Sequence, residues 1–173
     1  MSELLRSTAE ALSSDRLPRE LIVFVIALLP VFEVRGAVLA GIALFGMSAA
    51  DALLFGCLGN FVSVTPPLVF LDPLSKWLYG NRVADRIFHR LFAHTRKRAA
   101  QVNKWGMPGL VLLTSIPLPG FGAWTAVLIA FLLRMRWRRA LVATYAGIVI
   151  SGLIVAMLTL GGMAGVKSVT AGR

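Results

Sequence analysis

Four long apolar runs, separated by less apolar segments, dominate this chain. They cover residues 21–47, 51–71, 105–133 and 140–166. Each is long enough for a helix that crosses a hydrocarbon core of about 30 Å, which takes about 20 residues. The pattern predicts an all-α integral membrane protein. Ser48 and Asp51 fit a capping box at the start of the 51–71 span, and this favours capping over a proton-relay role for Asp51.

The third apolar run contains a bend. Residues 115–122, SIPLPGFG, include two prolines and two glycines in eight positions, a composition that ends a helix. Irregular backbone is tolerated at membrane depth only where protein buries it or water reaches it. We therefore expect residues 105–133 to form a re-entrant helical hairpin, with bends at Pro117 and Pro119.

The chain repeats itself at an offset of 89 residues. Residues 29–44, LPVFEVRGAVLAGIAL, align without gaps with residues 118–133, LPGFGAWTAVLIAFLL, and seven of the sixteen positions are identical. The first run, 21–47, is therefore also predicted to be a re-entrant hairpin, with its bend at Pro30. Each hairpin would be followed by one transmembrane helix.

Composition and charge agree with a membrane protein. The 173 residues are 57% hydrophobic and 15% charged, with a mean hydropathy of +0.77. A net charge of +10 and a pI near 11.3 would suggest nucleic acid as a partner of a soluble protein. Eight of the 18 Lys and Arg, however, fall in residues 72–104 and four in 134–139, beside apolar runs as in cytoplasmic loops. We expect contact with anionic lipid headgroups and none with nucleic acid.

The charge distribution also predicts the topology. Both basic segments lie on the cytoplasmic side if the run between them enters and returns, and the two repeats then have opposite orientations, as in many secondary transporters. The prediction is a single membrane domain, 1–173, with repeat one at about 21–71, a cytoplasmic basic segment at 72–104 and repeat two at about 105–166. The N-terminus would be outside.

A rival topology also satisfies the charge rule. In it, the first run crosses fully from a cytoplasmic N-terminus and the chain returns through residues 51–71. This alternative breaks the repeat symmetry and places a proline and two charges in a lipid-exposed span.

Residues 82–98 have the pattern of an amphipathic interfacial helix. Val83, Ile87 and Leu91 form an apolar stripe at helical spacing, with basic residues elsewhere. We expect this helix to lie on the inner leaflet.

Glu33 and Arg35 are charged residues in the middle of an apolar run. A charge at the centre of a membrane helix costs about 2.5 to 3.5 kcal/mol on insertion scales, so such residues usually face a cavity and pair. An extended hairpin tip between Pro30 and Gly36 would let both side chains enter one polar pocket. Glu33 would then take up and release a proton, and Arg35 would pair with it or with an anionic group; the alternative is a structural ion pair.

The second hairpin has Gly122 and Trp124 at the positions that correspond to Glu33 and Arg35. Backbone N–H groups around Gly120 and Gly122 could face a substrate oxyanion, and Trp124 could stack on a ligand or simply pack. Asn60 is polar in mid-span and could join the pocket or hydrogen-bond to a neighbouring helix. The lone Cys57 and the two histidines do not form a metal site, no cofactor is implied, and no nucleophile–base set indicates an enzyme.

The two motifs PVFEVRGAV, 30–38, and IPLPGFGAWTAVLIA, 116–130, resemble the bacterial family of putative small multidrug export proteins, a distant relative of the DedA family. The resemblance spans roughly residues 21–166. It implies a multi-pass protein of the cytoplasmic (inner) membrane. It also carries over a set of site residues: Glu33, Arg35, Gly36, Pro117, Pro119, Gly120, Gly122 and Trp124. In the DedA family the second hairpin carries arginine, a residue that pairs with phosphate. This chain has no arginine between Lys104 and Arg134, and this departure argues against a phosphate-lipid substrate.

Two functions follow as hypotheses. The first is a proton-coupled transporter or exporter of a small amphiphilic or lipid-like substrate. The second is a non-transporting membrane organiser that acts through its basic interfacial helix. A homodimer would bury open hairpins in either case.

Overall fold

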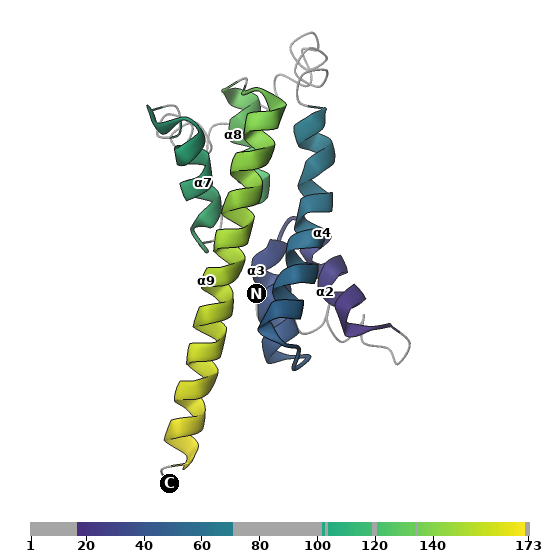
Figure 1. The fold of residues 1–173 in the computed structure, drawn as a ribbon, viewed down its shortest axis with the longest axis vertical. Coiled ribbons are helices and arrows are strands. Elements are labelled where there is room, and N and C mark those ends of the chain that lie inside the picture. Colours follow the sequence, from purple (N-terminus) through teal and green to yellow (C-terminus); the bar gives the residue numbers. More distant parts are fainter. Residues whose placement is uncertain (1–16, 71–101, 103, 119–120, 134, 172–173) are drawn as a thin grey trace. The chain divides into compact units, whose positions relative to one another are not determined.

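The computed structural model describes residues 17–70, 102, 104–118, 121–133 and 135–171, with side chains as far as residue 164. This part of the chain is helical and contains no strand (Figure 1), so the all-α prediction is confirmed for it. The helices are α2 (Arg19–Leu28), α3 (Glu33–Ala43), α4 (Ala49–Val69), α7 (Met107–Ser115), α8 (Ala123–Leu132) and α9 (Trp137–Ala171).

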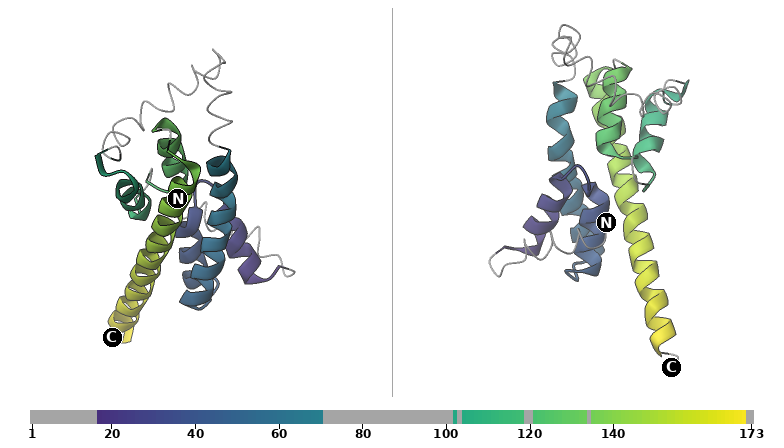
Figure 2. Two further views of the ribbon diagram at one scale, coloured as in Figure 1. Left: turned by 45° about the horizontal axis from the view of Figure 1, so that its top comes forward. Right: turned by 180° about the vertical axis from the view of Figure 1, so that it is seen from behind.

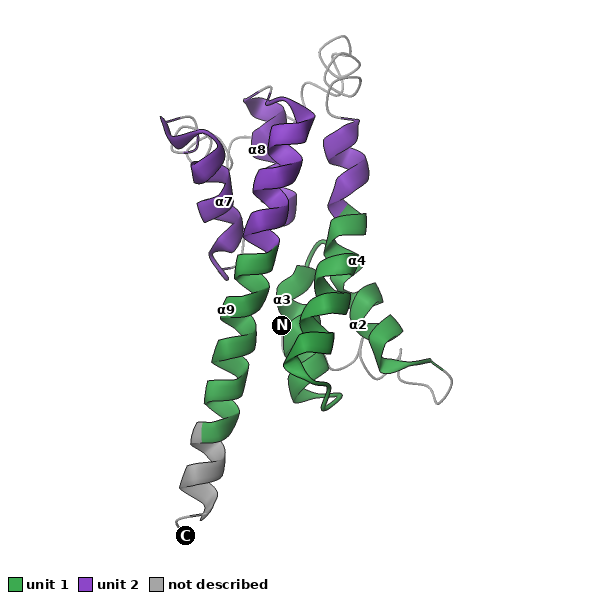
Figure 3. Ribbon diagram, in the orientation of Figure 1, with its two compact units in different colours: residues 1–63, 149–173 green, residues 64–148 purple. Residues whose placement is uncertain are grey.

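The chain divides into two compact units (Figure 3). Unit 1 consists of residues 1–63 and 149–173, and unit 2 of residues 64–148. The two long helices, α4 and α9, each pass from one unit into the other. Each unit therefore contains a pair of short helices and a part of both long ones.

In unit 1, α2 and α3 form a helical hairpin. Helix α2 ends at Leu28 because Pro30 disfavours helical geometry in the residue before it, and Leu29 is extended, with φ −76° and ψ 128°. The chain turns over residues 29–32 and continues as α3. The Nη1 of Arg19, at the start of α2, donates a hydrogen bond to the carbonyl oxygen of Phe45, just after α3, over 2.9 Å. The two ends of the segment 19–45 therefore lie side by side.

Small residues let this hairpin approach the first half of α4 closely (Figure 2). A Cβ added at Gly41 of α3 would lie 2.8 Å from the Cβ of Ala52. A Cβ at Gly59 of α4 would overlap the carbonyl oxygen of Phe24 in α2. Close contact between backbones is how helices associate where no water drives them together. The start of α4 is capped as expected, since the Asp51 N–H donates to Ser48 Oγ over 3.1 Å and the Ser48 hydroxyl donates to Asp51 Oδ2 over 2.6 Å.

Unit 2 contains a second pair of short helices. Helix α7 ends at Ser115, and Ile116 is extended (φ −70°, ψ 117°) because Pro117 follows it. Helix α8 begins at Ala123, and Gly122 is its N-cap. In α9, Gly147 packs so closely against Thr114 of α7 that a Cβ there would overlap the Thr114 side chain.

The bounds of the helices follow the repeat in the sequence. Shifted by 89 residues, Glu33–Ala43 would cover 122–132, and α8 covers Ala123–Leu132. Arg19–Leu28 would cover 108–117, and α7 covers Met107–Ser115. Both halves of the sequence thus have the same order of a short helix, a bend, a short helix and a long helix.

Two of the described helices are long and apolar enough to cross a membrane, by length and composition alone. They are Ala49–Val69 and Trp137–Ala164, which overlap the predicted spans 51–71 and 140–166.

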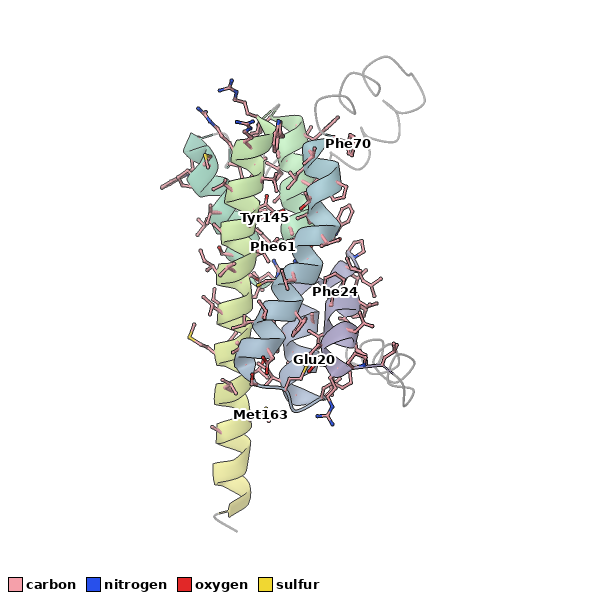
Figure 4. All side chains as sticks on the ribbon, turned by 45° about the vertical axis from the view of Figure 1, so that its right-hand side comes forward. Glu20, Phe24, Phe61, Phe70, Tyr145 and Met163 are labelled. Carbon is pink, nitrogen blue, oxygen red and sulfur yellow. The ribbon has the colours of Figure 1, made fainter. Side chains whose placement is uncertain are left out.

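The outer faces of these two helices are apolar. Large exposed side chains on α4 include Leu54, Leu58 and Val62, and on α9 they include Leu153 and Met157. Figure 4 shows carbon-coloured side chains along most of α9, with nitrogen-tipped ones near its start. Polar side chains are instead among the buried residues of these helices: Asn60, Thr144, Ser151 and Thr159. Contact of such an apolar surface with lipid tails costs little free energy, whereas its contact with water is unfavourable.

Three predictions lie outside the described residues. They are the interfacial helix at 82–98, the bend residue Pro119 and the candidate site residue Gly120.

Candidate functional site

Glu33 and Arg35 lie in the first turn of α3, so the expected extended tip is wrong. The Glu33 N–H donates to the Leu29 carbonyl over 3.0 Å, and the Gly36 N–H donates to the Phe32 carbonyl over 2.8 Å. The turn and the helix start thus pair backbone groups that would otherwise be unsatisfied in an apolar interior. Gly36 is buried within this turn.

Glu33 has an unusual backbone conformation. Its φ is +51°, and it is the single non-glycine residue with positive φ in the described part of the chain. The left-handed region costs an L-residue roughly 1 to 2 kcal/mol. The corresponding residue of the second repeat is Gly122, which carries no such penalty for any backbone angle. Strain that is kept at one buried carboxylate suggests a functional demand on that side chain.

Arg35 links α3 to α9. Its Nε donates a hydrogen bond to Ser151 Oγ over 3.1 Å, across 116 positions of sequence. Ser151 is 1% exposed and Glu33 is 7% exposed, whereas Arg35 is half-buried. The Arg35 guanidinium lies close enough to the Glu33 carboxylate for their charges to attract. The site therefore contains a buried carboxylate, a guanidinium and a hydroxyl from two helices.

Ser151 was missed by the sequence reasoning. It lies between two apolar stretches, GIVI and GLIVAML, and it is the one hydroxyl residue between Tyr145 and Thr159. A single hydroxyl in a long apolar span is a weak signal, because serine also packs between helices as a small residue.

The helix register places Asn60 at the level of Glu33. Helices α3 and α4 run antiparallel, with Gly41 against Ala52 and Gly56 against Ala37. One further turn along α4, from Gly56 to Asn60, corresponds to one turn back along α3, from Ala37 to Glu33. Gly56 and Asn60 share a face of α4, since residues four apart lie above one another. The Asn60 amide therefore belongs to the same end of α3 as the charged pair.

Asn60 is a buried amide with no partner among the described residues. Its side chain is 0% exposed, and neither Oδ1 nor Nδ2 has a hydrogen-bond partner in that part of the chain. An unsatisfied buried polar group costs about 1 to 3 kcal/mol. A group that needs two hydrogen bonds and makes none points to a small molecule, such as a water or a ligand, that supplies them.

The site lies deep along the two candidate membrane helices. Asn60 is eleven residues beyond Ala49, the start of α4, or about 16 Å at 1.5 Å per residue. The other charged side chains described in unit 1 are at the opposite end of α3: Arg19, bonded to Phe45, Glu20 beside it (labelled in Figure 4), and Asp51 in the cap of α4. Eleven residues of α3 hold these groups about 16 Å from Glu33.

The residues expected in the second hairpin belong to unit 2. Gly122 is buried and extended (φ 164°) as the N-cap of α8. Trp124 is half-buried, and its indole Nε1 is enclosed by the protein. Unit 2 also contains polar groups that were not predicted. The hydroxyls of Thr65 and Tyr145 share a hydrogen bond, and the buried Thr144 hydroxyl has no partner within the described ranges of the chain.

The described residues contain no group of three or more His, Cys, Asp or Glu that could hold a metal ion. Cys57 is a free, buried thiol, and its Sγ packs against Gly152 of α9.

Comparison with known proteins identifies the family. No curated protein and no solved structure matches the chain. A sequence model of the family described as "Putative small multi-drug export protein" matches residues 33–154, more than half of the chain. The match begins at Glu33 and extends past Ser151, so it includes every described residue of the site. Together with the two apolar helices it indicates a membrane protein, and the chain belongs to the family of putative small multi-drug export proteins.

Proposed function

We propose that this protein is a proton-coupled exporter of a small amphiphilic or lipid-like substrate, in which Glu33 takes up and releases the proton. The observation that carries the proposal is the set of polar groups at the N-terminal end of α3, which combines a buried carboxylate, Arg35, Ser151 and the unpartnered Asn60. Structure alone does not require this set, because a buried ion pair can often be replaced by apolar packing at little loss of stability.

The ionised and the protonated form of Glu33 differ in their effect on the buried site. When ionised, the carboxylate is attracted to Arg35; when protonated, it is neutral and leaves the Arg35 charge uncompensated. The two states differ by one proton and by the electric field at the site. A change of this kind can bias which side of the membrane the site opens to, and this is how a titrating group couples a proton gradient to transport.

The rest of the proposal concerns topology. We place the protein in the cytoplasmic membrane as a multi-pass protein, with the hairpins α2–α3 and α7–α8 as re-entrant elements of two inverted repeats. Support comes from helix length, since α2 has 10 residues and α3 has 11. Each is therefore about 15 Å long, half the thickness of a hydrocarbon core. The hydrogen bond from Arg19 to Phe45 supports a chain that enters and returns.

Proton flux into liposomes tests the role of Glu33. Wild type and Glu33→Gln are reconstituted with a pH-sensitive dye inside, a pH gradient is imposed, and anionic and cationic amphiphiles are added in turn. We expect wild type to show a flux that depends on one class of amphiphile and Glu33→Gln to show none, since an amide cannot carry the proton.

The matched control is Glu20→Gln, the same chemical change at an exposed carboxylate in the first turn of α2. It should retain the flux. Equal, substrate-independent dye signals from wild type and Glu33→Gln, with equal melting temperatures, would make the pair structural and favour the non-transporting organiser.

A further inference from the structure

Within the described part of unit 1, the charge that faces Glu33 comes from Arg35. Residues 149–164 of α9 have no titratable side chain. The one titratable group on the α4 face towards α3 and α9 is the Cys57 thiol, and the remaining charges among the described side chains of unit 1 lie at the far end of α3. Protonation of Glu33 therefore changes the net charge of the site from zero to +1.

The groups around this charge suit a negatively charged oxygen. Asn60 Nδ2 carries two N–H donors that no residue described by the structure uses. The N-terminal end of α3, an 11-residue helix, adds the positive end of its dipole. A cationic group would have to approach both this dipole and the fixed guanidinium, so the site opposes cations in either state of Glu33.

We propose, building on the proton-coupled function above, that the site binds the oxyanion of its substrate together with a proton on Glu33, and that Asn60 donates a hydrogen bond to that oxyanion. The ligand chemistry is a singly charged phosphate ester or carboxylate. Residues 105–133 lack the arginine that would pair with a phosphate, but Arg35 of α3 supplies a guanidinium at this site. The proton and the anion bind as a pair because each removes the charge that the other would leave unbalanced. Reciprocal coupling of this kind makes anion affinity depend on pH.

Binding of a non-titrating anion to the full-length protein in neutral detergent measures the coupling. The probe is a short-chain phosphatidylglycerol, whose phosphodiester keeps one negative charge across the pH range used. One proton taken up per anion weakens wild-type affinity by about tenfold for each pH unit above the titration of Glu33. Glu33→Gln, which resembles the protonated state, should bind with an affinity that does not change with pH, whereas Glu20→Gln should keep the wild-type slope.

Asn60→Leu tests the donor. It should weaken binding of the phosphodiester by about tenfold or more, the usual consequence of losing a hydrogen bond to a charged group. Its melting temperature should not fall, so that lost binding cannot come from unfolding. Unchanged affinity in Asn60→Leu would remove Asn60 from the proposal.

Two further ligands define the substrate class. A trimethylammonium lipid with the same chains should not bind. The water-soluble diester glycerophosphoglycerol has the same headgroup without the chains. If it binds as well as the lipid, the site recognises the free anion; if it does not bind, the site recognises the lipid. Wild-type binding that ignores pH, or that prefers the cationic lipid, overturns the proposal. If Glu33-dependent proton flux were driven by the cationic lipid, the proton-coupled function would stand and co-binding of an anion would be wrong.

Discussion

At the scale of single residues, the structure marks position 33 by its backbone as well as its charge. A positive φ of 51° favours glycine, and the repeat has glycine at the corresponding position 122. The chain nevertheless has a glutamate here. This conflict between local preference and residue identity is typical of functional sites, where local strain is offset by the surrounding fold.

The strain can be measured by comparing two substitutions that both remove the carboxylate. Glu33→Gly should be more stable than Glu33→Ala by about 1 kcal/mol, because alanine keeps the left-handed penalty. Leu39 is an exposed helical position of α3 and serves as the control. There Leu39→Ala should be more stable than Leu39→Gly by about 1 kcal/mol, since glycine weakens a helix. Chemical unfolding in detergent gives the differences, and alanine being the more stable at both positions would exclude strain at Glu33.

Two polar residues of α4 should respond oppositely to their removal. Asn60→Leu should raise the free energy of unfolding by about 1 to 3 kcal/mol, because an amide without partners is replaced by an apolar group. Ser63→Ala should lower it by about 0.5 to 1.5 kcal/mol, since Ser63 Oγ donates to the Leu28 carbonyl over 2.8 Å. A loss of stability in both variants would indicate that Asn60 is satisfied within the protein.

At the scale of elements, the hairpin of unit 1 depends on glycines that lie against neighbouring backbone. Gly59→Ala should destabilise the protein by about 1 to 3 kcal/mol, because the new Cβ meets the Phe24 carbonyl, which cannot move without displacing α2. Gly161→Ala is the control: a Cβ there meets nothing within 4 Å, and the change should stabilise α9 by up to about 1 kcal/mol. Thermal unfolding compares the two, and a neutral Gly59→Ala would contradict the close packing.

The elements also show what local sequence can predict. Pro30 and Pro117 lie just after α2 and α7, and the Ser48–Asp51 cap lies at the start of α4. These helix ends could be predicted because helix termination by proline and capping by a side chain each act within a few residues. The extended tip around Glu33 was wrong, since prolines and glycines indicate where a helix stops but not how soon the next one begins. Here α3 begins three residues after Pro30.

At the scale of the whole molecule, the two topologies differ in the position of the N-terminus. A re-entrant first hairpin places Leu17 and Ala50 on the same side of the membrane, whereas a full crossing places them on opposite sides. Single cysteines at these exposed positions, in a background where Cys57 is replaced by alanine, can be labelled from one side with an impermeant maleimide. We expect equal labelling of the two, and the opposite pattern for Phe70→Cys beyond the far end of α4. Unequal labelling of Leu17→Cys and Ala50→Cys would support the rival topology.

The sequence by itself determined the class of the protein, the approximate helix bounds, the repeat at 89 residues and the family, and it marked Glu33 and Arg35 as candidate site residues. Each of these follows from local pattern, because apolar run length, proline position and isolated charges are properties of short segments. Tertiary structure decided which groups meet. Ser151 joins Arg35 across 116 positions, and Asn60 reaches the level of Glu33 through glycine contacts between α3 and α4. Its lack of a partner is likewise a property of the packed helices, because hydrogen-bond partners depend on which faces of distant segments lie together.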